Sequence, residues 1–272
     1  FDITLAFING KLGDSDRVFC RLPKHWDSQK VRLLRALYGL KQSPRKWYDT
    51  YRSFLESRGW ATCATEPGLF REDDMTCSVY VDDTLISGPS KQDITNEMNA
   101  ILAHFKGEGV KPKEVHPDGT EERDLLGATL LYNQKKGTMK IHMKDYIEKM
   151  LADPTNGFKM QGCGTSATPC APYADLSSGR NRDDFPMRRL VGGLLWLAVM
   201  CRPDIQYAVS KLAQFADKPT QSAVVAGKRI LKYLKGTLET GVEYSKENEK
   251  AFKKTYTTVL EKHADERGES VP

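Results

Sequence analysis

The run Cys77-Ser78-Val79-Tyr80-Val81-Asp82-Asp83-Thr84-Leu85-Ile86-Ser87 decides the fold of this chain. Two short segments rich in β-branched and apolar residues flank a pair of adjacent carboxylates, which predicts a β-hairpin with both acids at its tip. Adjacent aspartates repel each other, and a divalent cation favours keeping both ionised. Because surface turns are often rich in aspartate, the run indicates a metal site only together with another carboxylate and a nucleic-acid-binding surface.

Length and composition describe an ordinary globular protein. The chain has 272 residues, 39% hydrophobic and 28% charged, which is enough for one large domain or two smaller ones. Its longest apolar stretch, residues 190–201, is too short to cross a bilayer, and we find no secretory signal. Six scattered cysteines without a C-x-x-C pair favour reduced thiols over disulfides or a zinc site. We therefore expect an intracellular protein without a membrane partner, and the missing initial Met is typical of a fragment.

Positive charge is concentrated in one segment. Between Arg21 and Arg58, ten Lys or Arg stand against three acidic residues, a net charge of +7, whereas the whole chain carries only +5. A basic segment of this kind is the usual electrostatic signature of a polyanion-binding surface. The alternative is a solvated helix face.

Periodicity and turn residues predict mixed strands and helices in the first half and mainly helices in the second. Besides the acidic hairpin, strands are expected at residues 1–8, 18–22, 31–34, 125–132 and 138–143. Helices are expected at residues 43–59, 90–105, 146–151, 185–200, 203–215 and 220–238. Residues 106–123 should form a loop, residues 153–184 a domain boundary, and residues from 245 onward a fraying polar tail. On the last helix Lys228, Lys232 and Lys235 share a face that could follow a phosphate backbone or simply be solvated.

Asp2 supplies a third carboxylate. It lies on a short apolar strand that could pair antiparallel with the Tyr80 strand and so reach Asp82 and Asp83. Three acids converging from two strands are what two-magnesium phosphoryl transfer requires, with one ion activating a 3′-hydroxyl and the other neutralising the leaving pyrophosphate.

A set of motifs appears in a fixed order along the chain. It consists of Asp2–Gly10, Leu37–Tyr48 and Tyr80–Asp83, followed by residues 125–127, 146–151, 190–196, 202–205 and 228–237. The set closely resembles the reverse transcriptase of copia-type (Pseudoviridae) retrotransposons, over roughly residues 1–244. The ordered set is far more specific than any single motif.

The resemblance implies a fold and an activity. The fold is α+β: a polymerase palm, in which helices back an antiparallel sheet, with partial fingers, a thumb and a mostly helical connection segment. The expected parts are residues 1–105 for the palm with partial fingers, 106–165 for the end of the palm and the thumb, 166–244 for the connection region and 245–272 for the tail. The implied activity is RNA-directed DNA polymerisation, in which dNTPs extend a primer on an RNA or DNA template with two Mg²⁺ ions, or Mn²⁺. Integrase and ribonuclease H of the same Pol polyprotein are the implied partners, in a cytoplasmic retroelement particle.

The resemblance also implies the catalytic and nucleotide-binding residues. Asp2 and Asp82 would be the principal metal ligands, with Asp83 beside them. Phe7 would lie under the sugar of the incoming nucleotide and exclude a 2′-hydroxyl by volume, although a core Phe at a strand end is the alternative. The other implied nucleotide-binding residues are Tyr38, Gly39, Lys41 and Tyr80, with Gly39 allowing close backbone approach.

The implied nucleic-acid-binding residues are Gln42, Ser43, Pro44, Arg45, Leu126 and Gly127. Lys41 and Arg45 could contact phosphates or be exposed cations, and Leu126-Gly127 would belong to a hairpin that holds the primer end. Lys111 and Lys113 are both candidates for the general acid that protonates pyrophosphate.

The sequence departs from the family pattern at both ends. The family's fingers begin upstream of Asp2 and its ribonuclease H domain follows downstream, and this sequence shows neither. Two alternatives to an active polymerase therefore remain: a catalytically inactive remnant of an inserted element, and a non-enzymatic nucleic-acid-binding module that uses the basic segment.

Overall fold

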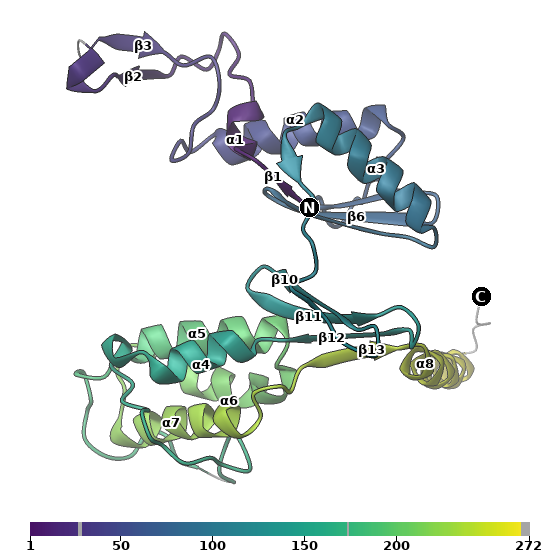
Figure 1. Ribbon diagram of the computed structural model, residues 1–272. Coiled ribbons are helices and arrows are strands. Elements are labelled where there is room, and N and C mark those ends of the chain that lie inside the picture. Colours follow the sequence, from purple (N-terminus) through teal and green to yellow (C-terminus); the bar gives the residue numbers. More distant parts are fainter. Residues whose placement is uncertain (27–28, 173, 268–272) are drawn as a thin grey trace. The chain divides into compact units, whose positions relative to one another are not determined.

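The computed structural model describes residues 1–26, 29–172 and 174–267, with the side chains of the last helix described as far as residue 259. The chain divides into two compact units, Phe1–Lys111 and Pro112–Pro272. Each unit combines helices with antiparallel strands (Figure 1). This mixture confirms the expected α+β class, whereas the assignment of palm, fingers, thumb and connection parts stays a prediction.

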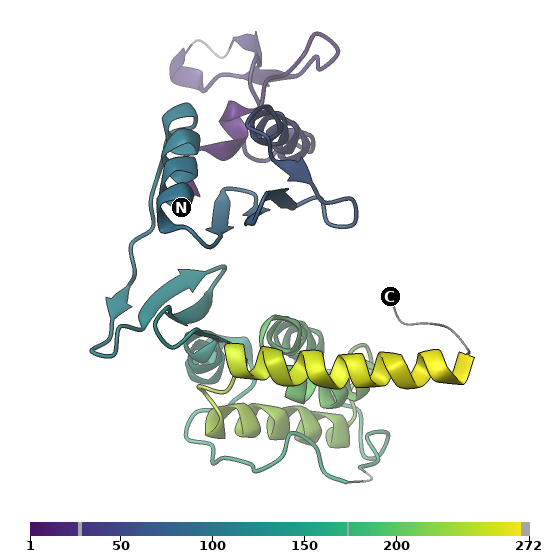
Figure 2. The ribbon, with the colours of Figure 1, turned by 90° about the vertical axis from the view of Figure 1, so that its right-hand side faces the viewer.

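The first unit is built on a six-stranded sheet. Its elements are β1 (Asp2–Ile3), α1 (Ala6–Asn9), β2 (Phe19–Arg21), the 3-10 helix η1 (Lys24–Trp26), β3 (Lys30–Arg32), α2 (Ser43–Ser57), β4 (Ala61–Thr62), β5 (Leu69–Glu72), β6 (Met75–Tyr80), β7 (Asp83–Ser87), α3 (Lys91–His104) and β8 (Gly107–Glu108). The strand order in the sheet is β4-β5-β6-β7-β1-β8, and β2 pairs with β3 separately. Both α2 and α3 cover the same face of the six-stranded sheet (Figures 1 and 2).

Helix α2 packs its apolar side onto that sheet. Pro44 lies in its first turn, where the N–H that proline lacks would have no helical partner. Trp47, Tyr51 and Leu55 recur every four residues, and each is at most 2% exposed. The ring of Phe105 meets the Trp47 ring edge-on at a centroid distance of 5.2 Å. The predicted helix over residues 43–59 is thus confirmed, and its buried side forms the centre of the first core.

The strands expected at residues 18–22 and 31–34 are present as β2 and β3, and their pairing extends beyond these strands. Backbone hydrogen bonds of 2.9–3.1 Å continue the pairing through Leu33 to Val18, Leu12 to Leu34 and Ala36 to Gly10. We call residues 10–36 the β2–β3 ribbon. It projects from the rest of the first unit (Figures 1 and 2).

The second unit joins a five-stranded sheet to a helical bundle. Its elements are β9 (Glu114–Val115), β10 (Glu121–Leu125), β11 (Ala128–Asn133), β12 (Thr138–His142), α4 (Lys144–Ala152), the 3-10 helix η2 (Pro154–Asn156), α5 (Met187–Met200), the 3-10 helix η3 (Pro203–Ile205), α6 (Gln206–Ala213), α7 (Gln221–Gly236), β13 (Val242–Ser245) and α8 (Lys246–Arg267). The strand order is β13-β12-β11-β10-β9. Leucines on α5, α6 and α7 fill the core, where Leu194, Leu212 and Leu234 are fully buried.

A buried arginine fastens η3 to the end of α7. Arg202 is fully buried and donates to both carboxylate oxygens of Asp204, at 2.9 and 2.8 Å. It also donates to the carbonyl and the hydroxyl oxygen of Thr237, at 2.9 and 2.8 Å. The Tyr233 hydroxyl completes the network by donating to Asp204 at 2.8 Å. The motif at residues 202–205 therefore holds two helical segments together.

Several local predictions were wrong. Residues 106–123 are not a loop, because β8, β9 and the start of β10 form there; their charged residues hide the strand pattern. The single strand expected at residues 125–132 is broken by a turn at Leu126 and Gly127, whose φ angles are 54° and 77°. Only Asp2–Ile3 of the strand expected at residues 1–8 is extended, because Leu5 adopts φ 54° and α1 follows.

The segment at residues 153–184 does not separate two compact units. The division falls at residues 111 and 112, and Phe158 and Met160 are buried in the core of the second unit. Residues 245–267 of the expected fraying tail are ordered as the last residue of β13 and as α8, and residues 268–272 lie outside the described residues.

Candidate active site

The sheet of the first unit brings the predicted acids together. Strand β1 lies between β7 and β8, and Asp2 is paired directly opposite Asp83 of β7. The backbone N–H of Ile3 donates to the carbonyl oxygen of Asp82 at 3.1 Å. Directly opposed residues of an antiparallel pair place their side chains on the same face. Asp2 therefore lies beside the acidic doublet, but through β7 and not, as expected, through the strand that carries Tyr80. That the three acids share cations stays a prediction.

Aromatic side chains of α2 pack against the acidic hairpin and form hydrogen bonds with it. Tyr80 pairs with Asp83, so that Val81 and Asp82 form a two-residue turn. Val81 has φ 58°, an uncommon conformation for a β-branched residue. The indole N–H of Trp47 donates to the Val81 carbonyl oxygen at 2.5 Å, and the hydroxyl groups of Tyr51 and Thr84 lie 3.1 Å apart. The sequence predicted a helix over residues 43–59 but not these hydrogen bonds, because periodicity does not show them.

Tyr38 and Phe7 lie beside the acids. The two rings are 4.7 Å apart between centroids. Burial raises the pKa of the Tyr38 hydroxyl, and the negative charges of Asp82 and Asp2 raise it further. The electrostatic influence of both carboxylates on one phenol places Asp2, Asp82, Tyr38 and Phe7 in a common neighbourhood. Tyr38 as a residue remains 54% exposed, so a ligand can reach it.

The segment that follows Tyr38 is shaped by backbone conformation. Gly39 has φ 92° and no atom within 4 Å of the position of an added Cβ, so positive φ rather than close packing explains glycine there. Gln42 is the N-cap of α2. Ser43 is buried, and its hydroxyl donates to the Leu37 carbonyl oxygen at 2.6 Å, so this side chain fixes the turn.

The exposed predicted residues differ in how they are held. Arg45 pairs with the Asp49 carboxylate at 3.0 Å, whereas Lys41 is exposed and forms no ion pair with any described residue. Tyr80, at the end of β6, is 62% exposed. Leu126 and Gly127 form the β10–β11 turn of the second unit, where the Gly127 N–H donates to the Asp124 carboxylate at 3.2 Å.

The two candidate general acids, Lys111 and Lys113, lie in different units. Lys111 ends the first unit and Lys113 belongs to the second. The Lys113 ammonium lies 3.3 Å from Glu122 and 3.8 Å from Asp145. Its hydrogen bond to Glu122, together with the charges of Asp145 and Glu122, raises the pKa of Lys113. The choice between them stays open.

Two residues of the site were missed from the sequence. Glu108 of β8 is paired with Asp2 on the side away from Asp83, which adds a fourth carboxylate to the row. A Cβ at Gly107 would lie 2.3 Å from the Asp2 carbonyl oxygen, so only glycine lets β8 approach β1. The two-residue strand is too short for periodicity to reveal.

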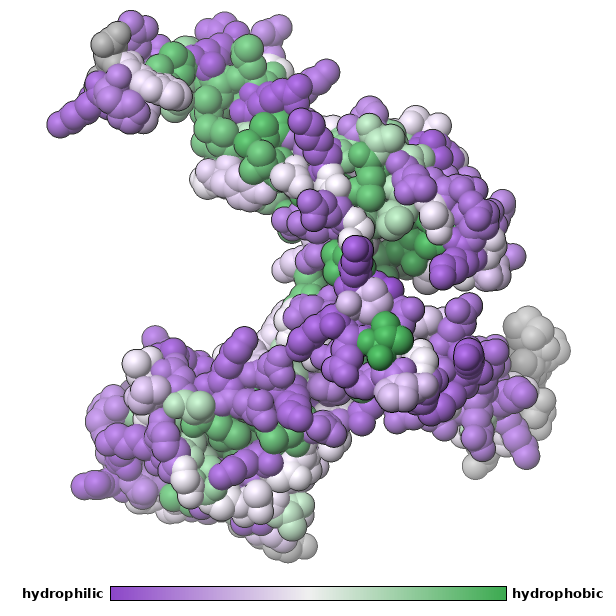
Figure 3. All heavy atoms as spheres, viewed as in Figure 1, coloured by the Kyte–Doolittle hydropathy of each residue, from purple (hydrophilic) through white to green (hydrophobic). Residues whose placement is uncertain are grey.

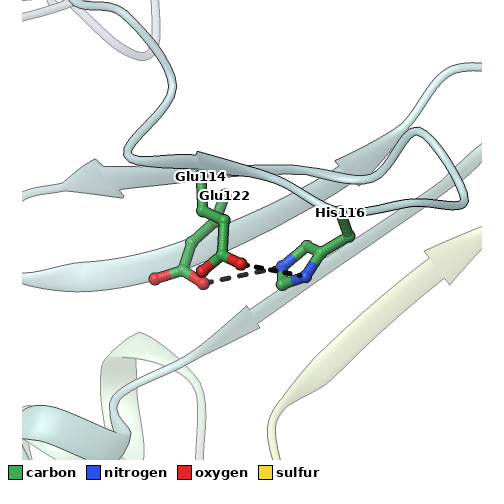
Figure 4. Close-up of side chains that lie close together, drawn as sticks. All are labelled: Glu114, His116 and Glu122. Carbon is green, nitrogen blue, oxygen red and sulfur yellow. Dashed lines mark ion pairs between the residues drawn. The ribbon is translucent and has the colours of Figure 1, made fainter.

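A second group of metal-ligand types lies in the second unit (Figure 4). The group consists of Glu114, His116 and Glu122. Each residue offers one potential ligand atom, and these three atoms lie within 4.8 Å of one another. Among the described residues, the three aspartates of the first unit do not form so close a group of ligand atoms. The His116 ring faces both carboxylates, which lie on the same side of it (Figure 4), with Nδ1 3.8 Å from Glu114 and Nε2 3.7 Å from Glu122. The pairing of Glu122 with Lys113 and with this ring explains the group as a surface ion-pair cluster.

Two of the three lysines on α7 contact other residues of the chain. The Lys228 ammonium lies 5.9 Å from the centroid of the Phe185 ring, and Lys235 donates to the Cys163 carbonyl oxygen. Of the three lysines expected to share a face, Lys232 is the exposed one. The contacts of Lys228 with Phe185 and of Lys235 with Cys163 therefore disfavour the phosphate-tracking interpretation.

Comparison with known proteins identifies the family. The family described as "Reverse transcriptase (RNA-dependent DNA polymerase)" matches residues 1–172. The chain belongs to this reverse transcriptase family. Its acidic hairpin, the Phe7–Tyr38 pair and helix α2 all lie within the matched residues.

Relatives of this reverse transcriptase domain are transposon polyproteins. It is 31% identical over 257 residues to the retrovirus-related Pol polyprotein from transposon RE1 of Arabidopsis thaliana, covering 91% of this chain and 16% of that protein. It is 28% identical over 255 residues to that from transposon TNT 1-94 of Nicotiana tabacum, covering 87% and 18%. It is 32% identical over 261 residues to that from transposon RE2 of A. thaliana, covering 91% and 17%. The chain thus spans less than a fifth of the length of each of these relatives, and the predicted copia-type kinship is confirmed.

Among the described residues, no helix combines the length and the apolar character that crossing a membrane requires.

Proposed function

We propose that this chain is the polymerase part of a copia-type Pol polyprotein and adds deoxynucleotides to a primer on an RNA or DNA template. One observation carries the proposal: the β1–β7 pairing sets Asp2 opposite Asp83 and next to Asp82. Asp2, Asp82 and Asp83 would be the residues that hold Mg²⁺, or Mn²⁺, between them.

The donor set fits such ions. Carboxylate oxygens are the ligands that hard divalent cations prefer, and like charges that repel one another are stabilised by a shared cation. When bound, the ions supply electrostatic stabilisation for the attacking 3′-hydroxyl and for the departing pyrophosphate. The residues of the chain then have to position the reactants, which is where most of the rate enhancement of phosphoryl transfer originates.

The neighbours of the acids suggest how positioning is achieved. The Phe7 and Tyr38 rings, tilted by 52° against each other, lie beside Asp2 and Asp82, and the sugar and base of the incoming nucleotide would contact them. The exposed Lys41 would contact its phosphates. The Trp47 and Tyr51 hydrogen bonds would keep the acidic turn in place while the reactants bind.

Strand β6 offers a matched test of the acids, since an aspartate doublet stands at each of its ends. Asp82→Asn in an upstream-extended polymerase should abolish primer extension on poly-rA/oligo-dT and leave template-primer affinity broadly intact. Asp74→Asn, in the turn between β5 and β6, removes the same charge at the far end of the strand and should leave extension unchanged. Full extension by Asp82→Asn would refute the polymerase proposal.

The inactive-remnant and binding-module alternatives are separated by the same assay. Primer extension by the chain would contradict both alternatives. Salt-sensitive binding of template-primer without extension would instead favour a binding module. Neither binding nor extension would favour an inactive remnant.

A further inference from the structure

The β2–β3 ribbon has one face that is both basic and aromatic. The register pairs Phe19 with Arg32 and Arg21 with Lys30, and directly opposed residues point to the same face. All four side chains are exposed, Phe19 by 60%. Leu34 continues this face toward the base of the ribbon and is 71% exposed.

Two of the three cations on this face, Arg21 and Lys30, have no acidic partner among the described residues. Arg21 and Lys30 are like charges directly opposite each other, an arrangement that destabilises an isolated strand pair. Neither forms an ion pair with a residue that the structure describes. Residues 10–36 contain seven Lys or Arg and three Asp, a net charge of +4, and the carboxylates of Asp14 and Asp16 are taken up by Arg32 and Lys46, at 3.1 and 2.7 Å. The face is therefore a place where an anion would relieve repulsion.

Exposed aromatic surface accompanies the charge. Trp26 at the far end of the ribbon is 61% exposed, and its ring meets that of His25 edge-on at 5.8 Å. Apolar and polar residues alternate over this part of the surface (Figure 3). Cations interleaved with exposed rings are the combination that binds single-stranded nucleic acids, since cations neutralise phosphates and rings stack on bases. Binding of an acidic protein would require the cations but would not require exposed aromatic rings.

The ribbon is also connected to the candidate active site. Its backbone pairing ends at Gly10 and Ala36, three residues after Phe7 and two before Tyr38. A strand bound along the ribbon would thus lead to the Phe7 and Tyr38 rings beside Asp2 and Asp82. We propose that the face formed by Phe19, Arg21, Lys30 and Arg32 binds a single-stranded polynucleotide, which, if the proposed function holds, is the template ahead of the site of synthesis.

Direct binding tests this proposal without requiring catalysis. The whole chain is titrated into fluorescein-labelled single-stranded oligo-dT and oligo-rU at several salt concentrations, without metal or dNTPs. Arg21→Gln/Lys30→Gln should weaken binding and lower the slope of log affinity against log salt by roughly 1.4, since each phosphate contact on a single strand contributes roughly 0.7. The matched control Arg71→Gln/Lys91→Gln removes two exposed cations of the same unit outside the ribbon and should bind like wild type.

The aromatic contribution is tested separately. Phe19→Leu keeps an apolar side chain but removes the ring, and it should weaken binding roughly fivefold or more without changing the salt slope. Phe19→Tyr should bind like wild type. Variants are compared by circular dichroism, and because the two changes are independent, each one tests the face if the other fails to fold.

Three results would overturn the proposal. The first is an equal loss of affinity in the ribbon variant and the control variant. The second is an unchanged affinity for Phe19→Leu. The third is equal competition by polyglutamate and by single strands, which would indicate an acidic protein partner. Asp82→Asn should bind single strands like wild type. If the wild-type chain binds through Phe19 but no form extends a primer, the ribbon proposal stands and the proposed function fails.

Discussion

The indole N–H of Trp47 donates a 2.5 Å hydrogen bond to the carbonyl oxygen of Val81, which connects helix α2 to the turn that carries Asp82. Val81 holds a left-handed conformation there, with φ 58°. A strained turn persists only where its surroundings fix it. We therefore regard Trp47 as a positioning residue for the acidic doublet.

Trp47→Phe should impair both stability and extension. Loss of the buried hydrogen bond leaves the Val81 carbonyl without this donor and should cost about 1–3 kcal/mol of unfolding free energy, measured by urea denaturation. Displacement of Asp82 should reduce primer extension by roughly tenfold or more. Trp60→Phe is the control, because the Trp60 indole donates instead to Glu97 at 3.2 Å. Equal extension by the two variants would show that Trp47 has only a structural role.

Asp82→Asn should also lower the pKa of the Tyr38 hydroxyl. Burial and the charges of Asp82 and Asp2 raise this pKa, so removal of one charge should return it toward its ordinary value. The titration can be followed by NMR of ¹³C-labelled tyrosine, with the Tyr38 signal assigned by Tyr38→Phe. Asp74→Asn should leave it unmoved. An unshifted Tyr38 pKa in Asp82→Asn would separate the phenol from the acids.

Phe7→Ala should relax discrimination against ribonucleotides. If the Phe7 ring excludes a 2′-hydroxyl by volume, its removal should raise the kcat/KM for UTP relative to that for dTTP, by roughly tenfold or more. Phe54→Ala removes a ring that stacks on His104 at 4.3 Å and should leave the ratio unchanged. A constant ratio in Phe7→Ala would favour the interpretation of Phe7 as a core residue.

Glu72→Gln should stabilise the protein at neutral pH but not in acid. Burial, followed by the charges of Glu97 and Asp73, raises the pKa of Glu72, and its Oε2 is buried without a hydrogen-bond partner in the described structure. A raised folded-state pKa means that the carboxyl contributes stability below its unfolded value of 4.5 and loses that contribution as the pH rises through the folded-state pKa. Melting temperatures of Glu72→Gln and wild type should converge near about pH 4 and diverge above it. The same comparison with Glu66→Gln should show no such divergence.

The two Arg–Asp pairs of the second unit test the effect of burial. Arg202 pairs with Asp204, and Arg182 pairs with Asp184, with the same spacing and through two hydrogen bonds each. Arg202→Ala should cost about 3–5 kcal/mol, because it leaves a partly buried carboxylate without its cation. Arg182→Ala, next to a carboxylate that is 68% exposed, should cost about 1 kcal/mol or less. Similar losses in chemical denaturation would contradict the role assigned to the buried network.

Short-range signals predicted the parts of the fold that repeat or turn in a regular way. The stripe of Trp47, Tyr51 and Leu55 identified α2, and the Ser90 side chain accepts from the Asp93 N–H at 3.3 Å, as its position before a helix predicts. The meeting of Asp2 with Asp83 is a contact between residues far apart in the chain. It was predicted from the chemistry of a two-metal site, which requires three carboxylates from two strands to lie close together.

The features that sequence reasoning missed are those that the three-dimensional environment imposes. Glu108 lies opposite Asp2 only because β8 pairs with β1. The need for glycine at residue 107 follows from its close approach to the Asp2 backbone. The charged stretch Glu121-Glu122-Arg123 forms part of β10 because pairing with β11 and β9 overrides its low intrinsic preference for strands.

The position of β1 has a practical consequence for anyone who produces or labels this chain. Asp2 is the second residue, and its strand is enclosed on both edges by β7 and β8. An affinity tag or fluorophore joined before Phe1 would start one residue from Asp2, a proposed metal ligand, on an interior strand of the sheet. Attachment after α8, in the other unit, keeps such an addition out of that sheet.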